Sequence, residues 1–334
     1  MITAPSSWQK PEHHLKMLFS NSWYKTLNKI FSQVLSSTHD FYKIEEIEPT
    51  VFPITTGSVS SPMGLGSDSS PVSVKIKNND VFLADSMQFS LEIGARLNKK
   101  GAYYVMPTFR GEQTDSRHLN EFVHSEVEIK GSLADIKKLA ERYIKYLING
   151  LLKNCEKEIF AVAGTIEHLR LALNRDFPSI RFEDAQKELK GIEGALETSS
   201  CGEQVITSVG EKELIKRLGD FTWLTNMPWL IVPFYQAKES NTKFSMTADL
   251  LGGIGEMLGS GQRVLNNSDV DESLKFHKVD ENGYLWYKEM RDIETVQTSG
   301  FGLGTERFLL WALKHNDIRD CTLLLRDHSK IIFP

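Results

Sequence analysis

The segment that most constrains the fold lies near the end of the chain, at residues 299–311. Gly300, Gly302 and Gly304 alternate in it, and alternate glycines predict a strand with one face on which another group can approach the backbone closely. Arg307 follows at the start of a short apolar run that is typical of a buried helix. A permanent cation between a glycine-rich strand and a helix suits the binding of a phosphate group.

A second cationic segment lies upstream, at residues 109–128. Arg110 and Glu112 are two residues apart, so on a strand their side chains point to the same face, and Glu126 and Glu128 repeat this spacing. Two strands joined by a polar loop with cations predict a groove that grips a polyphosphate. The loop and the return strand add Arg117, His118 and Phe122, whose ring offers a base a stacking surface.

Together these segments resemble motifs 2 and 3 of the class II aminoacyl-tRNA synthetases, and most closely those of the asparaginyl enzyme. Residues 85–92 resemble the substrate loop of that family, and residues 249–263 resemble its strands with a carboxylate and an arginine. Residues 286–291 lead into motif 3 as they do in the family. All these segments follow one another in the family's order.

The resemblance implies an α+β fold of the class II synthetase catalytic type, with a mainly antiparallel sheet flanked by helices. It implies a single catalytic domain over residues 1–334, with a helical N-terminal extension at about 1–38 and a helical insertion at about 132–204. We expect no anticodon-binding domain, because roughly 40 residues of helical pattern are too few for a five-stranded barrel. A strand with a proline at Pro49 implies a homodimer, although a proline also marks a plain sheet edge.

The resemblance also implies which residues bind ATP and its metal ion. Arg110 and Arg307 are the expected catalytic residues, because their guanidinium groups stabilise charge on the phosphates. Asp249 and Glu256 are the expected Mg²⁺ ligands, since a hard cation needs oxygen ligands; the alternative is a solvent-facing carboxylate pair. The expected ATP-binding residues are Arg110, Glu112, Arg117, His118, Phe122 and Arg307.

The amino acid is expected at Gln88, Glu92, Glu126 and Arg263, again by resemblance. We expect Arg263 to read a polar side chain with Glu126 as its partner, although a buried arginine or glutamate often belongs to a structural ion pair. The family carries lysines where this chain has Leu91, Trp229 and Val232. The ATP half therefore matches the family, while the substrate half departs from it.

These expectations define an ATP-dependent, AMP-forming ligase. It activates aspartate or a similar small polar amino acid as an acyl-adenylate and passes the acyl group to ammonia or an amine without tRNA, as in the related AMP-forming asparagine synthetase. Two alternatives remain open: a truncated synthetase paralogue that charges an RNA or a carrier, and a non-catalytic paralogue that senses an amino acid.

Composition restricts the partners and the location. The formal net charge of −5 and the pI near 6.0 argue against a protein that mainly grips a nucleic-acid backbone, so we expect no stable tRNA binding. No apolar run reaches the length of a membrane span, so we expect no membrane contact. Three scattered cysteines lack metal-ligand spacing, which favours a reduced, cytoplasmic protein.

Hydrophobic periodicity predicts several local elements. It indicates a helix over 13–36, a strand over 41–51 and a long amphipathic helix from Ser132 to about Cys155. Residues 177–182 and 183–196 indicate a strand that enters a helix. The Gly-, Ser- and Pro-rich segment 55–71 predicts a loop, either a lid over the substrate or a plain linker.

Overall fold

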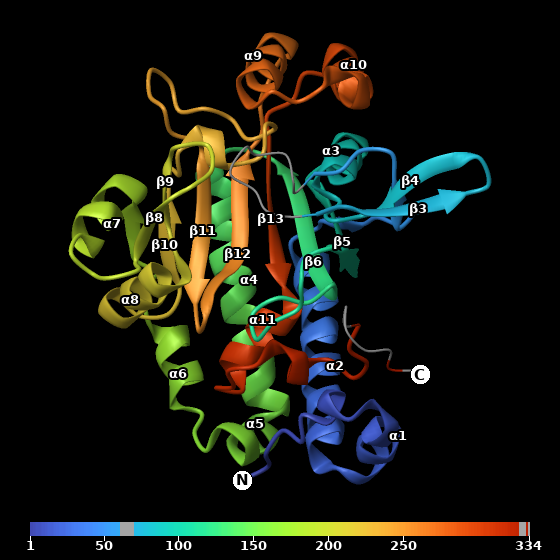
Figure 1. The fold of residues 1–334 in the computed structure, drawn as a ribbon, viewed down its shortest axis with the longest axis vertical. Helices are drawn as coiled ribbons and strands as arrows, with labels where there is room; N and C mark the ends of the chain where they lie inside the picture. The colour runs from blue at the N-terminus through green and yellow to red at the C-terminus, as the bar shows by residue number, and fades with distance from the viewer. Residues whose placement is uncertain (61–69, 327–331, 333–334) are drawn as a thin grey trace.

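The computed structural model describes residues 1–60, 70–326 and 332 of the chain. At its centre is an eight-stranded sheet whose two outermost strand pairs are parallel and whose inner pairs are antiparallel (Figure 1). This arrangement confirms the expected mainly antiparallel sheet. In spatial order its strands are β1 (Glu48–Pro49), β5 (Gly101–Phe109), β6 (Glu121–Lys130), β13 (Thr298–Gly304), β12 (Gly255–Gln262), β11 (Thr247–Gly252), β10 (Thr222–Thr225) and β7 (Ser179–Arg181).

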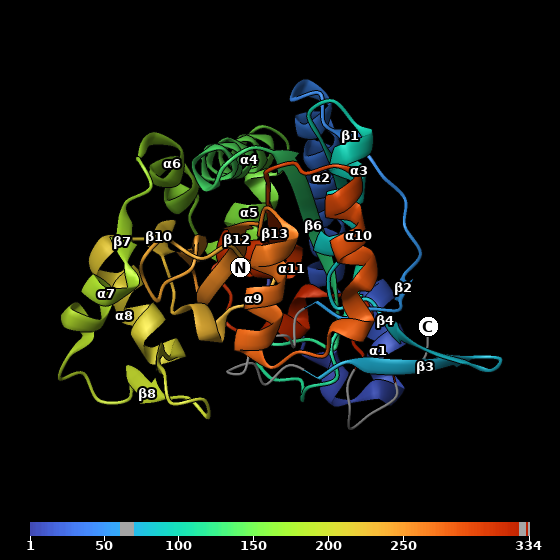
Figure 2. The same cartoon turned by 90° about the horizontal axis from the view of Figure 1, so that it is seen from above.

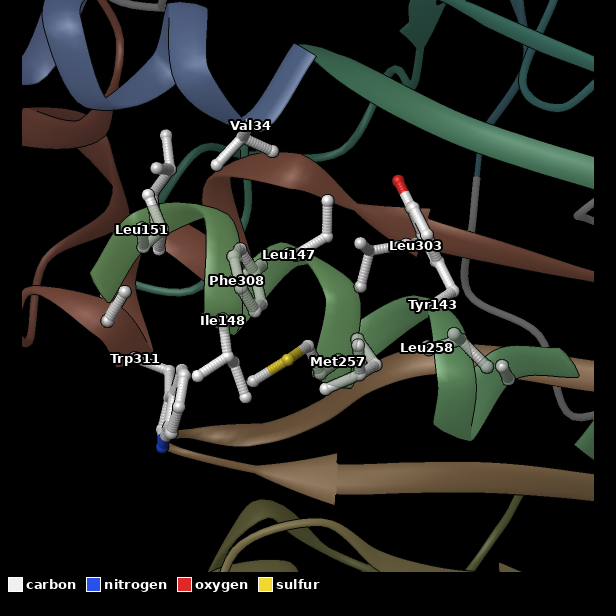
Figure 3. Close-up of a cluster of buried hydrophobic side chains, with 14 of the residues drawn as sticks. Val34, Tyr143, Leu147, Ile148, Leu151, Met257, Leu258, Leu303, Phe308 and Trp311 are labelled. Atoms are coloured by element: carbon white, nitrogen blue, oxygen red, sulfur yellow. The ribbon is translucent and has the colours of Figure 1, made fainter. Parts of the chain in front are cut away.

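Three helices cover one face of this sheet: α2 (Ser22–Ile44), α4 (Leu133–Asn154) and α11 (Thr305–Ala312). Figure 2 shows α2 and α4 together on one side of the strands. In Figure 3, Leu147 of α4 lies among side chains of the sheet and of α11, such as Leu303 and Phe308, and all three are fully buried. This core holds the strands of both motifs against one rigid helical layer.

The long helix α4 begins where the sequence predicts. Ser132 caps it: its hydroxyl accepts a hydrogen bond from the backbone N–H of Asp135, whose carboxylate accepts one from the N–H of Ser132. This reciprocal capping box satisfies two backbone donors that the helix itself leaves unpaired. The helix ends at Asn154, within a residue of the expected end.

The expected strand over 41–51 is wrong for most of its length. A short helix α1 (Pro11–Ser20) precedes α2, which continues to Ile44 and leaves β1 only two residues. Tyr42 explains the extension, because its buried ring stacks on Tyr103 and Tyr143 at centroid distances of 4.2 and 5.2 Å. Tertiary packing of the aromatic side chains therefore overrides the local alternation.

The segment 132–204 supplies more than helices, because β7 from within it joins the main sheet. The helix expected over 183–196 ends early: α7 (Phe182–Leu189) is followed by Gly191 and Gly194, whose φ angles of 87° and 73° break a helix. The other elements between α4 and β10 are α5 (Glu156–Ala163), α6 (Glu167–Asn174), β8 (Leu196–Thr198), β9 (Gln204–Ile206) and α8 (Ser208–Leu218).

A hairpin of β3 (Val72–Ile76) and β4 (Asn79–Leu83) projects from the molecule (Figure 1), and β2 (Thr55–Thr56) pairs with β4. The expected loop 55–71 therefore contains β2, while its residues 61–69 lie outside the described part. Among the described residues, no helix is both long and apolar enough to cross a membrane. The other elements are α3 (Gln88–Leu97), α9 (Asn267–His277), α10 (Leu285–Ile293), and the 3₁₀ turns η1 (Ser7–Gln9), η3 (Trp229–Ile231), η4 (Glu281–Tyr284) and η5 (Ile318–Cys321).

Candidate active site

Two cavities open on the sheet face that α4 does not cover. Along β6 and β13 the side chains alternate, so Val127 and Leu303 enter the core while Glu126 and Gly302 face the cavities. The first cavity has a volume of about 430 Å³ and the second about 300 Å³. One face of these strands therefore packs in the hydrophobic core, and the other face lines the candidate site.

The first cavity contains every residue that we expected to bind ATP. Arg110 and Glu112 do not lie on a strand as predicted, because β5 ends at Phe109, but the loop still carries both into the cavity. The Arg110 guanidinium carbon lies 5.5 Å from the centre of the Phe122 ring, a cation–π distance. The expected residues in this lining are Arg110, Glu112, Arg117, His118, Phe122 and Arg307.

The other basic side chains that line the first cavity each lie close to an oxygen atom of the protein. Arg117 forms an ion pair of 2.8 Å with Glu211 of α8, and His118 lies 3.0 Å from Asp115. Arg307 donates to the backbone carbonyl of Glu256. The Arg117 and Arg307 side chains nevertheless stay 20% and 22% exposed, so their charges remain open to a ligand.

Glu211 is a residue of this region that the sequence did not point to. Burial and the negative charge of Glu256 raise its pKa, and Arg117 and Arg307 oppose that rise. No motif spacing marks Glu211, because it lies on α8, far along the chain from the motif 2 segment. Its contact with Arg117 is visible only in the folded chain.

The alternate glycines of β13 leave room for acidic side chains of the neighbouring strand. A Cβ atom at Gly300 would collide with Glu128 and Gln88, and one at Gly302 would meet Glu126 Oε1 at 3.0 Å. The close approach predicted from these glycines therefore exists, and the approaching groups are the protein's own carboxylates. A larger side chain at either position would push them out of the site.

Arg263 dominates the second cavity, but its partner is not the one expected. Its Nε and Nη2 donate to Glu128 at 3.0 and 2.9 Å, while Glu126 is engaged elsewhere. Its Nη1 donates to Gln236 at 2.8 Å, and its Nη2 also donates to Gln88. Burial lowers the pKa of Arg263, but Glu128 more than restores it, so the guanidinium stays charged and largely saturated.

Glu126 is the second buried charge of this cavity. Its carboxylate accepts hydrogen bonds from the Ser86 hydroxyl at 2.6 Å, the Met87 backbone N–H at 2.8 Å and the Tyr104 hydroxyl at 2.6 Å. Burial raises its pKa, but the charge and hydrogen bond of His124 and the bonds of Ser86 and Tyr104 outweigh burial and lower the pKa to about 2. Glu126 is therefore an anion at neutral pH.

Glu92 does not reach the cavity, contrary to expectation. It lies on α3 rather than in a loop, and its side chain is 1% exposed in an ion pair of 2.9 Å with Arg291 of α10. Leu91 also misses the cavity, because it packs in a small core against Met87 and Tyr104. These two residues join helices to the sheet, whereas Gln88, at the start of the same helix, does line the second cavity.

Asp249 and Glu256 come together beside Gly259, as a metal site requires. A Cβ atom at Gly259 would lie 2.9 Å from Glu256 Oε1 and 3.6 Å from Asp249 Oδ1. A bulge produces this arrangement, since Leu250 pairs with Leu258 but Leu251 pairs with Glu256. The extra residue turns Glu256 to the same face as Gly259, although they are three residues apart.

The chemistry of this carboxylate pair fits a hard cation. Burial and the charges of Glu256 and Glu211 raise the pKa of Asp249 well above its ordinary value. A divalent cation would relieve this repulsion, and two carboxylates leave further positions of Mg²⁺ for phosphate oxygens. Within the described residues, no group of three or more His, Cys, Asp or Glu side chains is arranged to hold a metal by itself.

The two cavities share part of their walls. Arg110, His124, Glu256 and Gly302 line both of them. A ligand that fills both cavities must therefore pass beside these residues. We call this region the junction.

An apolar wall closes the second cavity where the resembling family has lysines. Val232 lines it as expected, together with Met227, Ile231 and Pro233. Trp229 does not: its indole N–H donates to the Gln236 carbonyl at 2.9 Å, and its ring stacks on that of Phe276. Trp229, which stands where the family has a lysine, therefore packs beside the second cavity and does not line it.

Two further residues of the site escaped the sequence analysis. His124 lies on β6 and lines the junction, and its position two residues before Glu126 on a strand was the signal that placed it on the same face. Glu306 lies in the first turn of α11, and its carboxylate accepts a hydrogen bond from the backbone N–H of Val123 at 3.0 Å. Burial raises the pKa of Glu306 to about 8.

Comparison with known proteins agrees with this geometry. The sequence model of the family described as tRNA synthetases class II (D, K and N) matches residues 10–328. The asparaginyl-tRNA synthetase from Pyrococcus horikoshii complexed with asparaginyl-adenylate is similar in structure, with a TM-score of 0.88 and 23% identity over 98% of this chain and 74% of that chain. The asparaginyl-tRNA synthetase from Entamoeba histolytica in complex with asparaginyl-adenylate has a TM-score of 0.84 and 21% identity, over 99% of this chain and 73% of that chain. The aspartyl tRNA synthetase from Entamoeba histolytica has a TM-score of 0.77 and 18% identity, over 99% of this chain and 64% of that chain. At these identities the structures share the fold.

Proposed function

This chain belongs to the family of class II tRNA synthetases (D, K and N), and on that premise we propose that it is an ATP-dependent, AMP-forming ligase. Its substrate is a small polar amino acid, activated at its carboxylate as an acyl-adenylate. The observation that carries the proposal is the junction. An acyl-adenylate consists of a nucleotide and an amino acid joined at one phosphate, and two cavities that meet beside Arg110 match that shape.

The first cavity has the groups that a nucleotide needs. Glu112 Oε2 is buried and accepts no hydrogen bond from the described residues, so an exocyclic amino group of a base can supply one. Phe122 offers its ring for stacking, while Arg117 and Arg307 offer charge to the outer phosphates. These contacts hold ATP by its base and by its phosphates at the same time.

The reaction is then a displacement at the α-phosphorus. The amino-acid carboxylate attacks, pyrophosphate leaves, and Arg110 stabilises the charge that develops on the α-phosphate oxygens. Asp249 and Glu256 would hold Mg²⁺, which would supply positive charge beside the phosphates. The remaining work of the protein is to align the carboxylate with the phosphorus and to exclude water.

The second cavity favours an uncharged polar side chain over a carboxylate. Arg263 already has its charge matched by Glu128, and Glu126 adds an ionised carboxylate to the lining. A substrate carboxylate there would meet repulsion from Glu126, while the guanidinium of Arg263 is already bonded to Glu128. Polar groups from Gln88 and Gln236 remain to hydrogen-bond an amide or a hydroxyl, so asparagine or a similar neutral amino acid fits better than aspartate.

We propose ammonia or an amine as the acyl acceptor, without tRNA. The net charge of −5 supports this choice, because binding of a nucleic-acid backbone is driven by positive charge. One observation favours the alternative of an RNA acceptor: a groove of about 350 Å³ at the start of α4 carries more cations than carboxylates. It is lined by Lys99, Lys100, Lys130, Lys138 and Arg142, together with Glu45 and Asp135. Both acceptors use the same adenylate.

We also propose that the chain forms a homodimer across β1. This strand sits at the edge of the main sheet with Glu48 and Pro49 exposed, and Val51 beside it is 91% exposed. An exposed apolar residue at an unpaired edge is suited to contact with a second copy. Analytical ultracentrifugation should give the mass of two chains, and a monomer at micromolar concentration would contradict the proposal.

The experiment that tests the function is ATP–pyrophosphate exchange with each of the twenty amino acids, followed by product analysis. We expect exchange that depends on a small polar amino acid. Mass spectrometry after addition of ammonia or methylamine should then find the free amide, with AMP in equal amount. Acid-precipitable charging of tRNA without amide formation would select the RNA alternative, and absence of exchange with all twenty would reject the adenylate-forming function.

A further inference from the structure

His124 stands where the two cavities meet. It lines both, together with Arg110 and Glu256, and its side chain is 12% exposed. The Phe122 ring meets its imidazole edge to face at a centroid distance of 4.8 Å. The imidazole therefore borders the space in which nucleotide and amino acid would be joined.

The contacts of His124 fix the role of each ring nitrogen. Its Nδ1 lies 3.2 Å from Glu126 Oε1 and 3.3 Å from the Thr108 hydroxyl oxygen. The Glu126 carboxylate is an acceptor, so the neutral imidazole is favoured in the tautomer whose proton is on Nδ1, and this tautomer leaves a lone pair on Nε2. Nε2 makes no hydrogen bond with any residue in the described part of the chain.

We propose that His124 is the general base of the second half-reaction, in which the acyl group passes from the adenylate to ammonia or an amine. This inference rests on the proposed function. A histidine that is oriented by a carboxylate and keeps one nitrogen open to the reacting atoms has the geometry of such a base. Glu126 then acts as a positioning residue, because it orients the imidazole of His124. It bears on the substrate by way of His124 and not by the direct contact that we expected.

The step balances as follows. The unprotonated nitrogen of the amine attacks the acyl carbon, and a C–N bond forms. The surplus proton of that nitrogen moves to Nε2 of His124. The bond between the acyl carbon and the phosphate oxygen breaks, and its electron pair leaves with AMP. The amide is released, and the imidazolium returns its proton to water.

Other charged groups face the same space and bear on any pH dependence. Glu126 lies on the strand of His124, and Arg110 follows β5. The opposing elements contribute carboxylates and cations that border the two cavities: Asp249 and Glu256 from β11 and β12, Arg263 after β12, and Glu306 and Arg307 from α11. A purely structural His124 would support Phe122 and the cavity wall, and its loss would impair both half-reactions equally.

The test compares the two half-reactions in His124→Asn and His124→Gln. Asparagine keeps a donor toward Glu126 but has no basic nitrogen, and glutamine is the longer replacement in case one variant folds poorly. We expect the rate of amide formation from ammonia to fall at least 10²-fold further than the rate of pyrophosphate exchange. Added imidazole should restore transfer in His124→Gly. The exposed His13→Asn is the matched control and should lower neither rate.

Three results would overturn the inference. If exchange and transfer fall by the same factor, His124 is structural. If the wild type forms amide and the variants form it equally fast, the base lies elsewhere while the proposed function stands. If the wild type exchanges pyrophosphate but makes no amide from ammonia or methylamine, the acyl transfer of the proposed function fails, and the role of His124 fails with it.

Discussion

The two cavities treat their arginines in opposite ways. In the first cavity, Arg117 and Arg307 remain about one-fifth exposed and border open space, at 20% and 22%. In the second, Arg263 is 2% exposed and bonded to Glu128, Gln236 and Gln88. The guanidinium groups of Arg117 and Arg307 can thus contact a ligand, while the guanidinium group of Arg263 is already bonded to other side chains of the protein. On one sheet face, the arginines of the first cavity are thus suited to ligand binding, and the arginine of the second is suited to stabilising the fold.

Arg263→Leu should have the largest effect on stability. It leaves Glu128 buried without its cation, and loss of one partner of a buried pair costs about 3–5 kcal/mol in free energy of unfolding. Urea denaturation should detect this loss. Arg142→Leu is the matched control, because its pair with Glu45 is half exposed and should cost at most about 1 kcal/mol. Equal losses in both variants would contradict the contrast between the cavities.

Arg110→Ala and Arg307→Ala should affect activity instead. Loss of a charge contact to the reacting phosphates costs about 3 kcal/mol, so we expect pyrophosphate exchange to fall roughly 10²-fold. Their urea midpoints should remain close to that of the wild type. Exchange within about tenfold of the wild type in either variant would remove these arginines from the mechanism.

Glu306 should make stability depend on pH within the first cavity. Its pKa is raised by burial from 4.5 to about 8, so the folded state binds a proton that the unfolded state releases between these values. The stabilisation is complete below pH 4.5 and is lost as pH rises through 8. Glu306→Gln should therefore be close to the wild type in free energy of unfolding near pH 5 and exceed it by roughly 4 kcal/mol near pH 8. Parallel curves for both proteins would show that folding leaves the pKa of Glu306 unchanged.

Val232→Lys should give the smallest effect, by adding a cation to the apolar wall of the second cavity. We expect the ratio of aspartate to asparagine in the exchange reaction to rise by about tenfold, or about 1.4 kcal/mol. Val232→Leu is the control for a change of size alone. An unchanged ratio in Val232→Lys would mean that this wall does not face the substrate side chain.

Sequence reasoning predicted which residues come together where those residues lie on short local segments. The loop after β5, the start of β6 and the start of α11 bring all six residues expected to bind ATP to the first cavity. Five of them lie between Arg110 and Phe122, so one short motif keeps them close together. The capping box of α4 is local in the same sense. The strand expected over 41–51 failed because Tyr42 stacks on two distant aromatic rings.

The second cavity was less predictable, because its bonds join segments far apart in the sequence. Which of two carboxylates on β6 meets Arg263 depends on the register of β6, β13 and β12, and the structure selects Glu128. Glu92 is drawn away by Arg291, almost 200 residues further along the chain. The bulge that turns Glu256 toward Asp249 likewise leaves no sign in a simple alternation of residues.

The most direct test of the bipartite site is calorimetric titration with an aminoacyl-sulfamoyl adenosine, a stable analogue of the adenylate that carries asparagine. If the two cavities form one site that meets at Arg110, the analogue should bind at least about 10²-fold more tightly than AMP or asparagine alone, because it fills both halves at once. Arg110→Ala should abolish most of that advantage. An analogue that binds no more tightly than AMP would contradict the account, since the two cavities would then not be halves of one adenylate site.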